Sequence, residues 1–169
     1  MPASLSKRRM VTAMNRKRIF ITGMGAVTPV GVSTDAYWEG LASGRCGISE
    51  LEGEEFSNLP VRRAARVKDF EPRNYLSMRL VQDLEKYMQY AYVSAEEAVK
   101  QSGMETESSR VGIIMASALS GIGVIAETEA QYRLEGRSAG PKFLTKSMGN
   151  IAAAQFSIAH KIQGPSMTV

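Results

Sequence analysis

The sequence contains few of the residues that build disulfide and metal sites. Its 169 residues include one cysteine, Cys46, and one histidine, His160. A single cysteine excludes an internal disulfide framework and a cysteine-rich zinc site, and no carboxylate or cysteine stands at metal-ligand spacing from His160. Because no histidine lies near Cys46 in the sequence to act as its base, we interpret it as a loop thiol. We expect a reducing, cytoplasmic compartment and no cofactor.

Long hydrophobic runs are also absent. No apolar stretch approaches the roughly 18 residues of a membrane span, and no apolar core with a small-residue cleavage site stands near the N-terminus. We therefore expect neither a membrane span nor a secretory signal. Hydrophobic residues make up 44% of the sequence, which is typical of one globular domain at this length.

Positive charge is concentrated at one end of the chain. The net charge is +4, but six of the 21 basic residues lie before Ile19, where no acidic residue occurs. The sequence from Ile19 onward contains the other 15 basic residues and all 17 acidic ones. This part of the chain is therefore slightly acidic, and its charge does not indicate nucleic-acid binding. We interpret residues 1–17 as a basic, disordered extension, with Met14 as the natural start and an organelle-targeting peptide as the alternative. Residues 18–169 form the predicted domain.

A short apolar run and a glycine turn open this domain. Arg18–Thr22 has the β-prone composition of a strand, and Gly23 and Gly25 follow it directly. A strand followed by Gly-x-Gly is a feature of dinucleotide-binding sites. Here, however, Thr28 stands where the third glycine belongs and Pro29 where the helix should begin. We therefore predict a tight structural turn rather than a nucleotide site.

Two helices are predicted in the first part of the domain. Ser33 or Thr34 caps the first, whose buried side would include Trp38. Apolar residues from Leu80 onward trace one long amphipathic helix that ends near Gly103.

The second part alternates between strand and helix patterns. Residues 111–117 are almost all apolar, as in a strand buried on both faces of a sheet, and the helix that follows stops at Gly136. Residues 146–163 predict a helix, a Gly-Pro corner follows, and residues 166–169 predict another buried strand. This alternation predicts an α/β fold with a buried sheet. Because a buried strand rarely closes a protein, we expect the chain to continue beyond Val169.

Five stretches stand in an order that points to a known family. They read ITGMGAVTPVG, YWEGLASGRCGIS, AEEAVKQSG, RVGIIMAS and GNIAAAQFSIAHKIQGPSMTV, and together they span about residues 17–169. In this order they resemble the β-ketoacyl-acyl-carrier-protein synthases, with the elongating synthase II type as the most similar subgroup. The motifs are specific in combination, although each is weak alone.

The resemblance implies a fold and a reaction. The fold would be the thiolase-like α-β-α-β-α arrangement of two duplicated halves, of which this chain is an incomplete N-terminal half. In the family, the strand that begins Gly-Pro-Ser leads to a Thr-Ala-Cys turn, whose cysteine takes the acyl chain as a thioester. Two histidines of the second half assist decarboxylation of malonyl-carrier protein, and the carbanion attacks the thioester. Neither Cys46 nor His160 matches these residues, so we expect all three beyond Val169 and no catalytic residue within the chain.

The resemblance also implies binding roles for four residues. Leu119 matches a residue at the far end of the acyl pocket, and Phe143 matches an aromatic residue that reaches into the neighbouring subunit's pocket across a dimer interface. Arg79 and Arg137 are the candidates for docking the acidic carrier protein. The implied partners are an acyl carrier protein, malonyl and acyl thioesters, and a second copy of the chain.

Two stretches depart from the family pattern. The Gly-x-Gly-Gly turn reads Ala118-Leu119-Ser120-Gly121, and the added Cβ atoms restrict its backbone. The basic-Met-Asp sequence reads Asp83-Leu84-Glu85, which removes positive charge from the docking region. These changes favour a second hypothesis, a non-catalytic, chain-length-factor-like subunit that forms a heterodimer with an active synthase. A third hypothesis is a free-standing α/β binding module.

Overall fold

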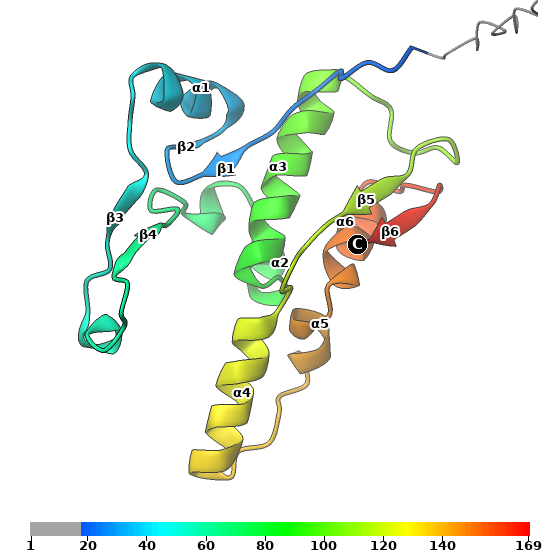
Figure 1. Cartoon of the computed structure of the whole chain (residues 1–169). Helices are drawn as coiled ribbons and strands as arrows, with labels where there is room; N and C mark the ends of the chain where they lie inside the picture. Colours follow the sequence, from blue (N-terminus) through cyan, green and yellow to red (C-terminus); the bar gives the residue numbers. More distant parts are fainter. Residues whose placement is uncertain (1–17) are drawn as a thin grey trace, which may run out of the picture.

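The computed structural model describes residues 18–169, so the extension predicted at residues 1–17 lies outside the described residues. Figure 1 shows the arrangement of the elements. The helices are α1 (Thr34–Ala42), α2 (Met78–Asp83), α3 (Lys86–Ser102), α4 (Ile122–Glu135), α5 (Phe143–Ser147) and α6 (Asn150–Ala159), with short 3-10 turns at Glu54–Phe56 and Pro72–Asn74. The strands are β1 (Val27–Thr28), β2 (Gly31–Val32), β3 (Ile48–Glu50), β4 (Arg63–Ala65), β5 (Ile113–Met115) and β6 (Ser166–Thr168).

The hydrophobic core forms where α3 meets α6. Met88 of α3, Phe156 of α6 and Leu84 between α2 and α3 are the largest fully buried side chains. Small Ala152 and Ala153 on α6 are also buried, which lets the two helices approach closely. In Figure 1, α3 stands at the centre of the molecule, with α6 beside the β5–β6 pair.

The strands of residues 18–169 form three separate two-stranded sheets. The β1–β2 and β3–β4 pairs are antiparallel, whereas β5 and β6 are parallel, with Ile114 opposite Met167. Ile113 and Met115 pack against the core, but Ile114 and Met167 on the other face are 69% and 54% exposed. The expectation of burial on both faces is therefore wrong for this chain, because a helix covers only one face of the pair.

The apolar run at the start of the domain is not a strand. Ile19, Phe20 and Ile21 are 93%, 69% and 83% exposed, and no strand within residues 18–169 pairs with them. A β-prone composition favours an extended backbone, but a strand also needs a neighbour for its hydrogen bonds.

The first helix begins and ends where the sequence predicts, but it packs differently. The Ser33 hydroxyl accepts a hydrogen bond from the Ala36 amide, as an N-cap does, and Ser43 follows the last residue. Trp38, predicted to be buried, is 71% exposed, and Gly40 is the buried residue of α1. A Cβ atom on Gly40 would overlap the Val30 carbonyl oxygen, so α1 lies too close to the chain before β2 for a side chain at this position.

The predicted long helix is broken near its start. Leu84 adopts an extended conformation, so α2 ends at Asp83 and α3 begins at Lys86. The buried Gln89 side chain donates to the carbonyl oxygens of Val81 and Leu84, which the break leaves without helical partners. The predicted end is confirmed, because Gly103 closes α3 with a φ of 63°.

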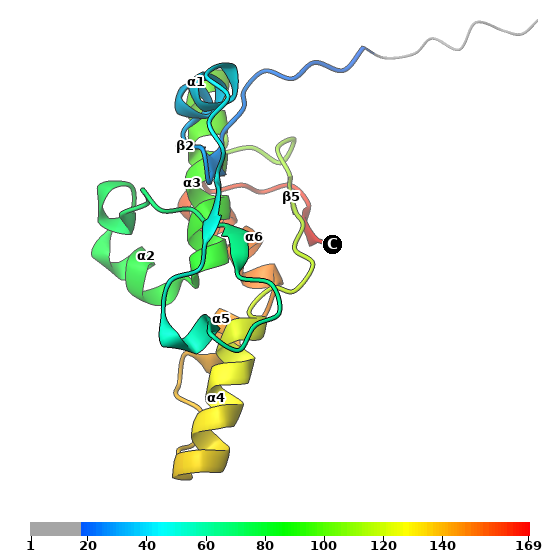
Figure 2. The ribbon, with the colours of Figure 1, turned by 60° about the vertical axis from the view of Figure 1, so that its left-hand side comes forward.

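Helices α4 and α5 project from the body as a hairpin, which Figures 1 and 2 both show. The α4 helix ends at Gly136 as predicted, and it buries none of its residues. Within residues 18–169, no helix is long and apolar enough to cross a membrane.

Candidate functional site

The carboxyl ends of β5 and β6 meet at one edge of their parallel pair. The Val169 amide donates to the Met115 carbonyl at 3.0 Å, and the Ser117 amide donates to the Val169 carbonyl at the same distance. The two strands therefore leave the pair side by side. In α/β proteins, ligands bind in the crevice outside the carboxyl ends of parallel strands, so this edge is the first candidate site.

The turn that follows β5 carries Leu119 to this edge. The Ser120 amide donates to the Ser117 hydroxyl at 2.9 Å, which closes the turn, and Leu119 is 69% exposed. Ser120 has a φ of 45°, a left-handed conformation that glycine adopts without strain and other residues do not. The departure from glycine predicted to restrict this turn therefore falls where the backbone needs glycine most.

Phe143 lies on the projecting hairpin, at the first position of α5. It borders a cavity of about 300 Å³ with residues of α4 and of the loop that joins the two helices. Leu119 does not line this cavity. The structure thus places the two candidate acyl-pocket residues on adjacent elements without bringing them into one cavity. The exposed apolar side chains on this hairpin and its turn are Leu119, Ile122, Ile125, Tyr132, Leu134 and Leu144.

The two candidate docking arginines lie on different elements and each has an acidic neighbour. Arg79 on α2 places its Nε 3.6 Å from Asp83, and Arg137, just beyond α4, places a guanidinium nitrogen 3.2 Å from Glu135. Both arginine side chains are largely exposed. They do not form one basic cluster.

Asp83 makes contacts that sequence reasoning missed. Its carboxylate accepts a hydrogen bond from Lys142 at 2.6 Å, across 59 positions of sequence, in addition to facing Arg79. The Lys142 ammonium group, with Arg79 adding to it, holds the pKa of Asp83 below its ordinary value. The only signal in the sequence was the departure from the family pattern at this position, which did not reveal the partner.

The lone cysteine and the lone histidine make their contacts with other residues than those of this edge. Cys46 is exposed in the loop after α1, where its thiol donates to the Ile48 carbonyl oxygen at 3.9 Å. His160 is the C-cap residue of α6, its ring stacks on Phe156 with centroids 4.1 Å apart, and its Nε2 shares a hydrogen bond of 2.8 Å with the Glu96 carboxylate. The sequence analysis did not reveal this carboxylate partner, which lies 64 positions away. The described residues hold no group of three or more potential metal ligands.

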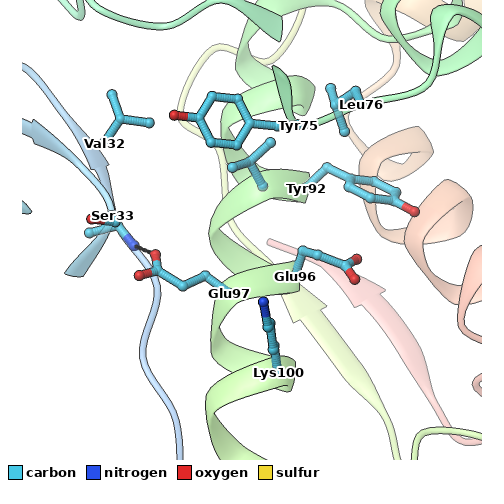
Figure 3. A pocket seen from close by; sticks show the side chains of 10 residues that line it. Val32, Ser33, Tyr75, Leu76, Tyr92, Glu96, Glu97 and Lys100 are labelled. Atoms are coloured by element: carbon cyan, nitrogen blue, oxygen red, sulfur yellow. Dashed lines mark hydrogen bonds between the residues drawn. The ribbon is translucent and has the colours of Figure 1, made fainter. Parts of the chain in front are cut away.

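A second cavity, of about 230 Å³, lies between α3 and the segment around β2 (Figure 3). The Glu97 carboxylate in its wall accepts hydrogen bonds from the backbone amides of Ala26 and Thr34, at 2.9 and 2.7 Å. The dashed line in Figure 3 ends on this carboxylate. Glu97 therefore holds the segment before β1 and the start of α1 against α3, which is a structural role.

The opening Gly-x-Gly segment contributes to the same packing. A Cβ atom on Gly23 would overlap the Ala98 carbonyl oxygen, and one on Gly25 would overlap that of Ser94. Both glycines are thus needed because the chain runs directly over α3. The tight turn predicted at Gly23 and Gly25 is wrong in its place, because residues 18–26 form no turn and the chain turns instead at Pro29 and Val30, between β1 and β2.

Comparison with known proteins gives the family. Residues 16–169 match the model of the beta-ketoacyl synthase N-terminal domain. The chain is 29% identical over 160 residues to 3-oxoacyl-[acyl-carrier-protein] synthase 2 of Coxiella burnetii, and 30% identical over 160 residues to the protein of the same name from Vibrio harveyi. Each match covers 92% of this chain and 39% of the relative.

Solved structures give the same fold. The ishigamide ketosynthase/chain length factor matches with a TM-score of 0.73 at 21% identity, over 88% of this chain and 38% of that one. The chain thus has part of the thiolase-like ketosynthase fold, as the resemblance implied, and spans about two-fifths of the relatives' length. The chain therefore belongs to the beta-ketoacyl synthase family, to whose N-terminal domain it corresponds.

Proposed function

We propose that this chain is the N-terminal part of a 3-oxoacyl-[acyl-carrier-protein] synthase. The whole protein would transfer an acyl group from a carrier thioester to its cysteine. Decarboxylation of malonyl-carrier protein would then release carbon dioxide and give a carbanion equivalent at the former methylene carbon. That carbon attacks the acyl thioester, so a carbon–carbon bond forms, the cysteine thiol leaves, and a 3-oxoacyl-carrier product results.

One observation carries the proposal, namely the parallel register of β5 and β6. In the proposed whole protein, this register would lead the residues after Val169 along the same edge as the turn that holds Leu119. A nucleophile a few residues further along would lie beside this turn, as the family pattern of a Thr-Ala-Cys sequence after Gly-Pro-Ser requires. The catalytic cysteine and both histidines belong, in this proposal, to the rest of the protein.

Phe143 and the exposed apolar hairpin support a homodimer. Helix α4 buries none of its residues, while Tyr132 and Leu134 are 60% and 84% exposed. An exposed apolar surface of this kind is typical of an interface. In the proposal, a second copy covers the hairpin, Phe143 reaches toward the partner's acyl pocket, and the complex works in the cytoplasm with an acyl carrier protein docked near Arg79 and Arg137.

The proposal is tested with the whole protein, malonyl-carrier protein and a series of acyl-carrier substrates, and mass spectrometry of the products. We expect 3-oxoacyl products and carbon dioxide in equal amounts. Replacing Leu119 with Phe should shorten the accepted acyl chains, because the larger side chain fills the far end of the pocket. A whole protein that folds but forms no condensation product with any acyl-carrier substrate would refute the proposal.

A second candidate function is the chain-length-factor-like subunit. The observation that favours it is Asp83, which places negative charge beside Arg79 where the family offers positive charge to the carrier. Such a subunit would lack the nucleophile and condense substrates only in a heterodimer with an active synthase. Condensation by the purified homodimer would exclude this candidate, whereas activity that appears only on adding a partner synthase would establish it.

A further inference from the structure

The short helix α5 is held at both of its ends by side chains from the junction of α2 and α3. Asp83, the last residue of α2, accepts the hydrogen bond from Lys142, which is the N-cap residue of α5. Tyr87, in the first turn of α3, donates its hydroxyl to the carbonyl oxygen of Met148 at 3.3 Å. Met148 is the C-cap residue of the same helix.

Helix α5 depends on such contacts because it cannot hold itself. It has five residues, far fewer than an isolated helix needs in water, and none of them is buried. The Lys142 ammonium group has no acceptor with which to cap the helix amides, and it donates a hydrogen bond to Asp83. Phe143 follows Lys142 directly, which ties the orientation of the Phe143 backbone to this ion pair.

The other end of α5 touches the turn that carries Leu119. A Cβ atom on Gly121 would overlap the Lys146 carbonyl oxygen, and one on Gly149 would overlap the Ser120 hydroxyl. The two candidate acyl-pocket elements are therefore packed against each other through α5. A shift of this helix would move both of them.

We propose that Asp83 is a positioning residue that fixes α5 and thereby sets the acyl-chain length that the enzyme accepts. The inference rests on the proposed function, because it takes Phe143 to line the acyl pocket. Asp83 stands where the family resemblance implies a basic residue, which could not accept a hydrogen bond from Lys142. The Nε atom of Arg79 lies 3.6 Å from the other oxygen of the Asp83 carboxylate, so each carboxylate oxygen has a cationic neighbour.

The test compares four variants of the whole protein. Asp83→Asn and Lys142→Gln each break the ion pair, and Asp83→Glu retains the charge as a rescue. Glu107→Gln is the matched control, since it breaks another exposed lysine–carboxylate pair of 2.9 Å that joins distant parts of the chain away from α5. Hydrogen exchange of the peptide that covers α5 and the product lengths in a mixed acyl-carrier assay are measured for each.

We expect α5 to exchange roughly two- to fivefold faster in Asp83→Asn and in Lys142→Gln, as for the loss of one exposed ion pair. Both variants should change the ratio of long to short products by a similar factor, while Asp83→Glu and Glu107→Gln match the wild type. Asp83→Asn also frees Arg79, so a lower KM for the carrier is expected in this variant alone. This difference separates an effect on carrier docking from an effect on the acyl pocket.

Two results would overturn the inference. One is unchanged exchange of α5 in both ion-pair variants, and the other is unchanged product lengths while the wild type condenses normally. A wild type that does not condense would instead refute the proposed function, and the exchange data would then decide by themselves whether Asp83 holds α5.

Discussion

Replacing Phe156 with Ala should remove much of the stability of the contact between α3 and α6. The Phe156 ring is 2% exposed, lies edge-on to Tyr92 with centroids 5.0 Å apart and stacks on His160 at 4.1 Å. Truncation of a buried Phe to Ala costs about 3–5 kcal/mol, because apolar contacts are lost and a cavity remains. Since the substitution also removes the aromatic contacts with Tyr92 and His160, we expect a loss of stability near the upper end of this range, about 4–5 kcal/mol.

Native-state hydrogen exchange of the α3 amides is the suitable assay, because it reports local stability without requiring two-state unfolding of a large protein. A loss of about 4 kcal/mol corresponds to roughly a 10³-fold fall in protection. The matched control is Ile158→Ala on the same helix, where the side chain is 72% exposed and a change within about 0.5 kcal/mol is expected. A fall in protection of less than about tenfold in Phe156→Ala would refute the placement of this ring in the core.

Three further predictions follow from contacts described above. Glu97→Gln should lower the stability of the first part of the domain by about 1–2 kcal/mol, because the amides of Ala26 and Thr34 lose a charged acceptor. Urea unfolding measures this loss, and an unchanged midpoint would contradict the structural role assigned to Glu97. Ser157→Ala should raise the unfolding midpoint slightly, since the buried Ser157 hydroxyl finds no hydrogen-bond partner among residues 18–169 and alanine favours a helix; a lower midpoint would indicate a hidden partner. Burial raises the pKa of the Tyr87 hydroxyl above its ordinary value of 10.0, so its contribution to stability is present below about pH 10 and is lost as the pH rises through the higher folded-state pKa. Tyr87→Phe should therefore reduce the alkaline loss of stability, and an identical pH profile would contradict this.

Signals that act over a few residues could be predicted from the sequence. Ser33 caps α1, Gly103 and Gly136 end α3 and α4, and Gly164 begins the corner before β6, all as expected. Ser33 acts on its immediate neighbours through a hydroxyl acceptor, and Gly103 and Gly136 act through a left-handed backbone. The family and its fold were also readable, because ordered motifs survive in the sequence itself.

The burial of side chains could not be predicted as accurately, because it depends on which distant segments of the chain pack against them. Trp38 and the run at Arg18–Thr22 have the composition of buried segments and are exposed, and one face of β5 is open at Ile114. Likewise, nothing in the helical periodicity marks the break at Leu84, where the buried Gln89 satisfies the freed carbonyls. These outcomes depend on neighbours that the local pattern does not contain.

The sequence by itself determined the family, most helix ends and the positions of Leu119 and Phe143 as candidates. The tertiary structure decided which charged residues meet. Asp83 with Lys142 and His160 with Glu96 are pairs 59 and 64 positions apart, and no local spacing relates their members. Chain folding brings them together because the helices pack on one core, and the packing of these helices, rather than any motif, positions α5 beside the site.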